Sequence, residues 1–121
     1  MLNRKSRSYQ DLQVWKASIQ LVKEVYSITG KFPATEGFGL TEQIRKAAVS
    51  IPSNIAEGQG RNSPKEFRQF LAIALGSVAE VETQLIIARE IDYVSNGEIN
   101  PLLILLDDIR KMAKALANSL R

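Results

Sequence analysis

Cysteine and histidine are both absent from this chain of 121 residues. The lack of cysteine excludes disulfides, thiolate metal sites and a cysteine nucleophile. The lack of histidine removes the commonest general base and the commonest metal ligand. An enzyme built from this sequence would depend on carboxylates, lysine, serine or tyrosine. We therefore predict a protein that is not an enzyme, has no catalytic residues, and holds no metal ion or cofactor.

Long apolar runs, strand-like alternation and a signal-peptide core are also missing, so we expect a cytoplasmic protein with no membrane partner. Apolar residues make up 45% of the chain and charged residues 24%, which indicates a folded domain with a modest core. We predict one domain over residues 9–121, preceded by a basic, flexible tail at residues 1–8.

Apolar residues recur at helical spacing in four segments. They predict helices over residues 11–29, 40–57 and 64–91 and from residue 101 onward. Ser63 begins a capping box, with Pro64 as the first helical residue, and Asn100 and Pro101 are expected to start the fourth helix in the same way. The connections are short, which predicts an all-α, antiparallel, up-down-up-down four-helix bundle.

The first helix has two apolar stripes, although an outer bundle helix needs only one. The stripe predicted to face the core consists of Leu12, Trp15, Ile19, Val22, Tyr26 and Thr29. Burial there would make Trp15 and Tyr26 poor platforms for base stacking. The second stripe needs another partner, as does an apolar edge of the fourth helix. The residues predicted to form an oligomer interface are Val14, Leu21, Val25, Ile28, Leu105 and Met112.

Pro52 lies among apolar residues that keep one helical phase from residue 44 to residue 55. A loop would lose this phase, so we predict that Pro52 kinks the second helix and that Gly58 and Gly60 end it. The segment 58–61 has no Walker lysine pattern and follows a helix, which favours a helix end over a phosphate-binding loop.

Gly76, in the middle of the third helix, is predicted to allow close approach of another backbone, formed by the small and polar residues 53–56. Glu80 lies one turn further along. A buried carboxylate needs a partner, so we predict a structural polar contact of Glu80 with Arg45 or Asn54. A carboxylate metal site is disfavoured because bundle sites of that kind include histidine.

The balance of charge is mildly basic, with 16 lysines and arginines against 13 acidic residues. The candidates for binding nucleic acid are Arg4, Lys5, Arg7, Lys16, Lys23, Lys46, Arg61, Lys65 and Arg68. An oligomer would repeat each modest patch, and counterion release makes affinity rise with the number of phosphate contacts. The alternative is that these residues are an ordinary solvated surface and a frayed tail.

Several motifs resemble the four-helix-bundle family of 23S rRNA intervening-sequence proteins. They are DLQVWKA (11–17), the FP…E…GL…QIRKAA run (32–48), SIPSNIAEGQGR (50–61) and EFRQFLAIALGSVAEVETQL (66–85). That family includes the accessory variability determinant of diversity-generating retroelements. The resemblance implies a homopentamer without recognised catalytic residues. In retroelement members it also implies binding of a reverse transcriptase and of nucleic acid through a basic surface.

We therefore expect a non-catalytic oligomer that binds RNA or DNA through a basic surface, as an adaptor for a reverse transcriptase or in association with rRNA. The alternative is a structural or protein–protein interaction module with no nucleic-acid ligand. One continuous positive face on the oligomer would favour nucleic acid, whereas alternating signs would favour the alternative.

Overall fold

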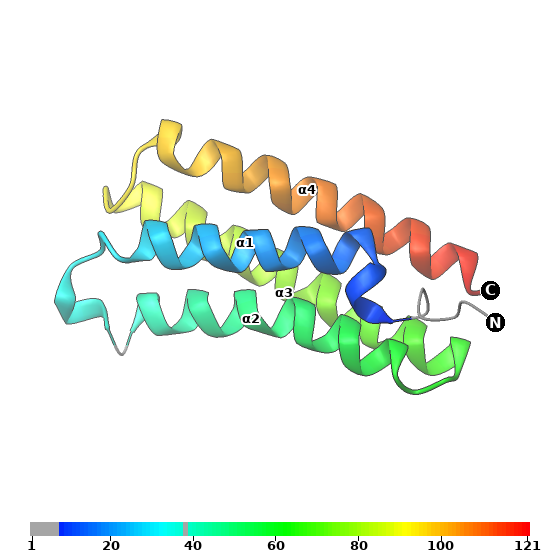
Figure 1. Cartoon of the computed structure of the whole chain (residues 1–121). Coiled ribbons are helices and arrows are strands. Elements are labelled where there is room, and N and C mark those ends of the chain that lie inside the picture. The colour runs from blue at the N-terminus through cyan, green and yellow to red at the C-terminus, as the bar shows by residue number, and fades with distance from the viewer. Residues whose placement is uncertain (1–7, 38) are drawn as a thin grey trace.

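The computed structural model describes residues 8–37 and 39–121, in which it has four α-helices, two short 3₁₀ helices and no strand (Figure 1). The α-helices are α1 (Gln13–Thr29), α2 (Leu40–Gln59), α3 (Pro64–Glu90) and α4 (Asn96–Ser119). The 3₁₀ helices are η2 (Tyr9–Asp11) and η3 (Ala34–Glu36). The predicted all-α, four-helix fold is confirmed.

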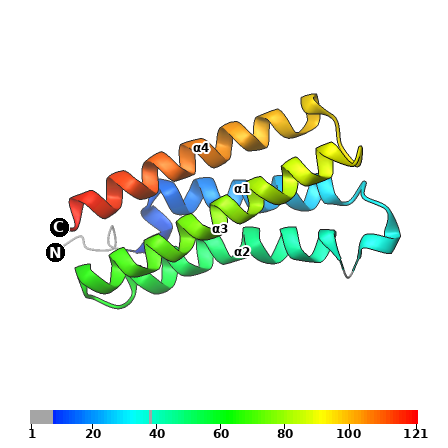
Figure 2. The same cartoon turned by 180° about the vertical axis from the view of Figure 1, so that it is seen from behind.

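The chain reverses direction at each connection, so successive helices run in opposite directions along the bundle (Figures 1 and 2). α1 packs against α2 and α4, and α3 packs against the same two helices. We call the end that holds η2, the α2–α3 connection and the last turn of α4 the proximal end. The opposite end, with the other two connections, is the distal end.

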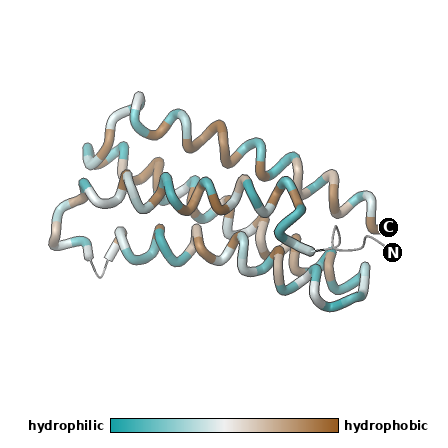
Figure 3. Tube along the Cα trace, in the orientation of Figure 1, coloured by the Kyte–Doolittle hydropathy of each residue, from teal (hydrophilic) through white to brown (hydrophobic). Residues whose placement is uncertain are grey.

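The core consists mainly of aliphatic side chains from the inner faces of all four helices, together with Phe67 and residues of the distal connections such as Phe32 and Val94. Leu21, Ile51, Leu85 and Leu106 are fully buried, one from each helix. Apolar positions recur along all four helices, as the brown segments in Figure 3 show. Each helix thus contributes one stripe to a shared interior, as amphipathic helices in a bundle do.

The predicted assignment of the two α1 stripes was wrong: the stripe assigned to the oligomer interface faces the core, and in the stripe assigned to the core only Thr29 is buried. Four residues assigned to the oligomer interface are buried in the core of the single chain, and they are Val14, Leu21, Val25 and Ile28. In the other stripe, Tyr26 is 45% exposed and Trp15 is half-buried. The positions of α2 and α4 decide which stripe faces inward. The periodicity of α1 alone gives no information about where those two helices lie. Leu105 and Met112 are half-buried, and their place in an interface stays a prediction.

α2 continues through Pro52 as one helix, and the kink itself stays a prediction. Two neighbouring side chains bond to carbonyl groups near the missing proline N–H. Ser50 Oγ donates to the Ala47 carbonyl at 2.8 Å, and Asn54 Nδ2 donates to the Ser50 carbonyl at 2.7 Å. Such local bonds support a helix around a proline. The helix ends at Gly60, as expected, but the expectation that Gly58 also ends it was wrong, because Gly58 lies inside α2.

The prediction that Gly76 allows the close approach of α2 and α3 was wrong, because the close approach occurs at Gly58. A Cβ atom on Gly58 would lie 2.6 Å from Phe70 Cβ, whereas one on Gly76 would meet nothing within 4 Å. Gly76 lies on the outer face of α3, and its neighbour Ser77 makes the contact with α2. The predicted packing of Ser53 and Ala56 against the Gly76 side of α3 was also wrong, because both residues line a hollow beside α1.

The predicted contact of Glu80 with Arg45 or Asn54 was wrong. Glu80 is exposed, and its carboxylate accepts a hydrogen bond from Gln84 Nε2 at 3.4 Å. Arg45 instead faces α1, and the Asn54 amide bonds to the backbone of its own helix. A carboxylate that stays in water needs no structural partner, which removes the reason for the predicted contact.

α4 begins one turn earlier than predicted. Ser95 Oγ accepts from the Glu98 N–H at 3.2 Å, and Glu98 Oε1 accepts from the Ser95 N–H at 2.8 Å. These reciprocal bonds form a capping box at Ser95-Asn96-Gly97-Glu98. The Asn-Gly pair in this segment is typical of turns, which is why the sequence favoured a later start for the helix. Pro101 therefore lies inside α4 and not at its first position.

α3 is long and apolar enough to cross a membrane by length and composition, with a mean hydropathy of 1.6 over an 18-residue window. The expectation that no apolar segment approaches membrane-spanning length was therefore wrong for α3. A core helix of a bundle meets the same criterion, and α3 packs against both α2 and α4. The hydropathy of α3 therefore carries no argument for a membrane.

Candidate nucleic-acid interface

Charge is divided unequally along the bundle. The paired hydroxyls of Ser50 and Ser77 lie 2.5 Å apart and mark a middle level that separates two halves. The proximal half comprises residues 8–20, 51–76 and 114–121. Its basic residues are Lys16, Arg61, Lys65, Arg68, Lys114 and Arg121, against only Asp11, Glu57 and Glu66. The formal charge of the proximal half is thus +3.

The distal half comprises the remaining described residues. Its seven basic residues are Lys23, Lys31, Arg45, Lys46, Arg89, Arg110 and Lys111. Its ten acidic residues are Glu24, Glu36, Glu42, Glu80, Glu82, Glu90, Asp92, Glu98, Asp107 and Asp108. The formal charge of this half is −3. A polyanion would therefore be attracted to the proximal end and repelled from the distal end.

The predicted nucleic-acid candidates fall on both sides of this division. Lys16, Arg61, Lys65 and Arg68 lie in the proximal half, and Lys23 and Lys46 lie in the distal half. Arg4, Lys5 and Arg7 lie outside the described residues. The sequence pattern did not point to Lys114 and Arg121. The signal that could have found them is the antiparallel connectivity, which brings the end of α4 beside the α2–α3 connection.

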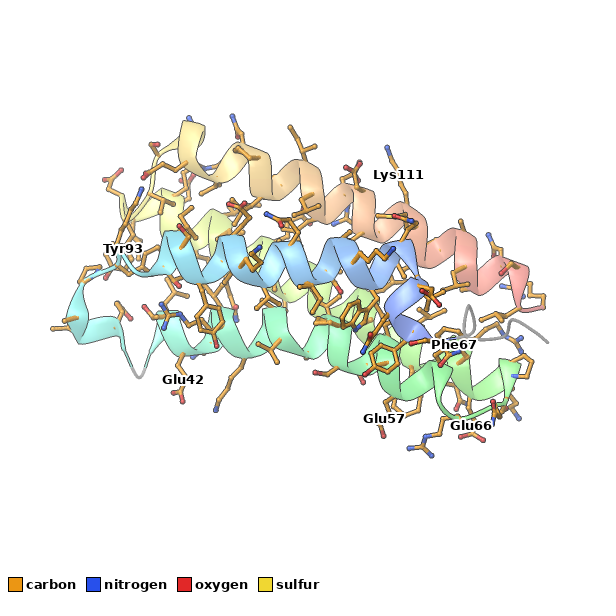
Figure 4. All side chains as sticks on the ribbon, viewed as in Figure 1. Glu42, Glu57, Glu66, Phe67, Tyr93 and Lys111 are labelled. Carbon is orange, nitrogen blue, oxygen red and sulfur yellow. The ribbon has the colours of Figure 1, made fainter. Side chains whose placement is uncertain are left out.

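The proximal cations differ in how much their own chain engages them. Arg61 pairs with Glu57 at 2.9 Å and Glu66 at 3.5 Å, the two carboxylates labelled near this end in Figure 4. Arg68 donates to the Leu120 carbonyl at 2.7 Å. Lys16, Lys65 and Lys114 have no ion pair with any residue that the structure describes. These three ammonium groups are free to contact phosphate.

A second feature is an apolar groove between α1 and α2, which we call the α1–α2 groove. Its proximal part is a hollow of about 290 Å³ lined mainly by Tyr9, Trp15, Ile19, Val22, Val49, Pro52 and Ala56. Its distal part is a hollow of about 530 Å³ with a mixed lining of Tyr26, Gly37, Thr41, Glu42, Arg45, Lys46, Val49 and Ser50. The exposed Tyr26 ring overturns the expectation that it is a core residue.

Arg45 is held in this groove without a carboxylate partner. Its Nε donates to Thr29 Oγ1 at 2.9 Å, and one terminal nitrogen donates to the Tyr26 carbonyl at 3.4 Å. The guanidinium carbon lies 4.4 Å from the centre of the Tyr26 ring, a cation–π contact. A guanidinium has five N–H donors, so several remain for an anion that enters the hollow.

The distal connections are tied together by polar contacts. Tyr93 donates its hydroxyl to Glu36 Oε2 at 2.7 Å. This bond lowers the pKa of Glu36 and raises the pKa of Tyr93. Lys31 Nζ donates to Glu98 Oε2 at 3.0 Å, while the Ser95 backbone N–H is the main cause of the lowered pKa of Glu98. These contacts hold the α1–α2 connection, which borders the groove, against the α3–α4 connection.

Across residues 8–37 and 39–121, no group of three or more acidic side chains is placed to hold a metal ion. The polar clusters described above are ion pairs, helix caps and a loop-to-loop hydrogen bond. The arrangement is that of a helical bundle whose two ends differ in charge and whose α1–α2 side has a groove.

The chain belongs to the family of 23S rRNA-intervening sequence proteins, whose family model matches residues 10–115. Its fold is similar to that of a solved protein of unknown function from the S23 ribosomal protein family of Bacteroides thetaiotaomicron. The TM-score is 0.79 at 21% sequence identity, and the match covers 86% of this chain and 97% of the other. No curated protein matches the sequence. At this identity the solved structure supports the fold alone.

Proposed function

We propose that this protein is a non-catalytic homo-oligomer that binds RNA or DNA through its proximal end. The observation that carries the proposal is the division of charge, +3 in the proximal half and −3 in the distal half. Phosphate backbones attract clustered lysine and arginine without regard to base sequence. The division favours the proximal end as the one that would meet the nucleic acid, although the net charge of the whole chain is small.

The oligomer is part of the proposal because a single basic end offers few phosphate contacts. Copies related by a cyclic ring point the same way, so a ring would bring all proximal ends to one face. Lys16, Lys65 and Lys114 would then be repeated around that face, and affinity would rise steeply with the number of contacts. The resemblance noted from the sequence implies five copies. A role as adaptor for a reverse transcriptase or for rRNA would use this face.

The test compares two triple variants that change the same number of charges. Lys16→Glu/Lys65→Glu/Lys114→Glu reverses the free proximal lysines, and Lys23→Glu/Lys31→Glu/Lys111→Glu reverses exposed distal lysines. Fluorescence anisotropy with a labelled RNA hairpin and a DNA duplex, at low and high salt, measures binding. We expect the proximal variant to lose at least about tenfold in affinity with a shallower salt dependence, and the distal variant to change little.

Equal losses in the two variants would contradict a proximal site, because net charge alone would then govern binding. Wild-type protein that binds neither probe at low salt would contradict nucleic-acid binding altogether. That second result would favour the other candidate function, a protein–protein interaction module. The observation behind this candidate is the α1–α2 groove, where Tyr26 and Val49 are 45% and 40% exposed.

A further inference from the structure

We propose that the outer face of α4 from one copy docks in the α1–α2 groove of the next copy, with Asp108 pairing with Arg45 across the contact. This inference rests on the oligomer proposed above and names the two surfaces that would form it. Both surfaces have exposed apolar side chains, and each contains one charged group that no described residue of its own chain pairs with.

The groove contributes the cation. Arg45 stacks on Tyr26 and bonds to Thr29, so its guanidinium has a fixed orientation before any partner arrives. Among the described residues no carboxylate pairs with it; the nearby Glu42 pairs with Lys46 at 3.5 Å. A fixed, planar guanidinium beside apolar surface favours a carboxylate carried on an apolar face.

α4 contributes the carboxylate. One outward stripe of α4 repeats at steps of four and three, and its members are Pro101, Leu105, Asp108, Met112 and Ala115. Ile104, beside this stripe, is 65% exposed, the most exposed large hydrophobic residue described. Asp108 is the only charged member of the stripe, and no described residue forms an ion pair with it. Its neighbour Asp107 differs, because it already pairs with Arg110 and Lys111.

The two charges lie at the same height along the bundle. α2 and α3 are antiparallel and Ser50 meets Ser77, so Arg45 is level with Glu82. Glu82 accepts from Arg110 of α4 at 2.9 Å. Asp108 is two residues from Arg110, a rise of about 3 Å in a helix. Arg45 and Asp108 are therefore close in height, although they lie on different helices of one chain.

Equal height matters because of how a ring closes. Copies in a cyclic ring are related by rotation without translation, so groups that meet across the contact must share one height. The groove and the α4 stripe are different surfaces, which gives a head-to-tail contact of the kind that forms rings. A charge pair inside an apolar contact also fixes the register of the partners.

The experiment reverses each charge and then both. Light scattering after size-exclusion chromatography gives the oligomer mass of the wild type, Arg45→Glu, Asp108→Arg and the double variant. We expect each single variant to weaken assembly at least about tenfold and the double variant to restore it. Glu80→Arg is the matched control, since it reverses an exposed carboxylate outside both surfaces and should leave the mass unchanged.

Asp108→Arg is the decisive single variant, because an exposed side chain with no partner can be reversed without disturbing the fold. An intact oligomer in Asp108→Arg, or a double variant that stays dissociated, would overturn the proposed contact. A wild type that is monomeric at micromolar concentration would overturn the oligomer as well. A wild-type oligomer that binds nucleic acid, together with an Asp108→Arg variant that stays assembled, would overturn this contact and leave the proposed function standing.

Discussion

The two flanks of α2 differ in how completely they are closed. Towards α3, Gly58 lets Phe70 approach so closely that a Cβ would collide, and the Ser50 and Ser77 hydroxyls touch. Towards α1, hollows of about 290 and 530 Å³ remain, and the rings of Tyr26 and Trp15 lie at the rim or partly in water. One helix thus has a seam of small residues on one side and a groove with large residues on the other.

This difference separates what holds the fold from what is available to a partner. Close packing removes surface from water and tolerates little change in volume. An open groove with exposed apolar residues keeps surface that only another molecule can bury. We therefore expect substitutions on the closed side and in the core to affect stability, and substitutions in the groove to affect assembly.

The largest contrast is expected within α1. Leu21→Ala removes a fully buried side chain and should lower the free energy of unfolding by about 3 kcal/mol, because it leaves a cavity. Ile19→Ala, in the groove, should cost the single chain less than about 1.5 kcal/mol. Chemical denaturation under conditions that hold both variants monomeric measures the difference. Similar losses for the two would erase the distinction between the inner stripe and the groove.

A smaller contrast is expected for two glycines inside helices. Gly58→Ala places a methyl group 2.6 Å from Phe70 Cβ and should destabilise by about 2 kcal/mol, since backbone must shift. Gly76→Ala meets open space and should stabilise by about 0.5–1 kcal/mol through helix propensity. Thermal melts of both variants check the opposite signs. A stabilising Gly58→Ala would mean that the α2–α3 seam is as open as the groove.

The smallest effect is expected at the distal rim of the groove. The pKa of Glu36 is lowered mainly by the Tyr93 hydroxyl, so the stability from this bond is present above the unfolded pKa of the carboxyl group. It is lost as pH falls through the lowered pKa of this carboxyl group in the folded protein. Tyr93→Phe should reduce this acid-dependent step, while the Leu40 backbone N–H still lowers the pKa of Glu36, and it should speed amide hydrogen exchange around residues 34–37, 39 and 40 near neutral pH. An unchanged exchange rate there would count against a stabilising role for the bond.

Much of the fold followed from local patterns. The helical spacing of apolar residues placed the four helices, and Ser63-Pro64 placed the start of α3. Ser95 and Glu98 also form a local signal, but the adjacent Asn-Gly pair is typical of turns and Pro101 offered a rival start. The sequence shows two apolar stripes on α1, one more than an outer bundle helix needs. Because the two stripes have the same periodicity, the sequence does not show which of them faces the interior.

The candidate site was only partly predictable. Lys16 and Lys65 were identified as basic surface residues, but their grouping with Lys114 depends on where α4 ends in space. Arg45 was expected to meet Glu80 on α3, and it turned towards α1 because its position on α2 faces that seam. Contacts between residues far apart in the sequence depend on helix rotation, and spacing within one helix does not specify it.

The sequence by itself determined the four helices, the family and the surplus of apolar surface, because each depends on local residue order. Only the tertiary structure decided which stripe of α1 is inside, which glycine is crowded and how charge divides between the two ends. The physical reason is that these properties depend on the rotation and direction of each helix relative to its neighbours. Packing of all four helices together sets them.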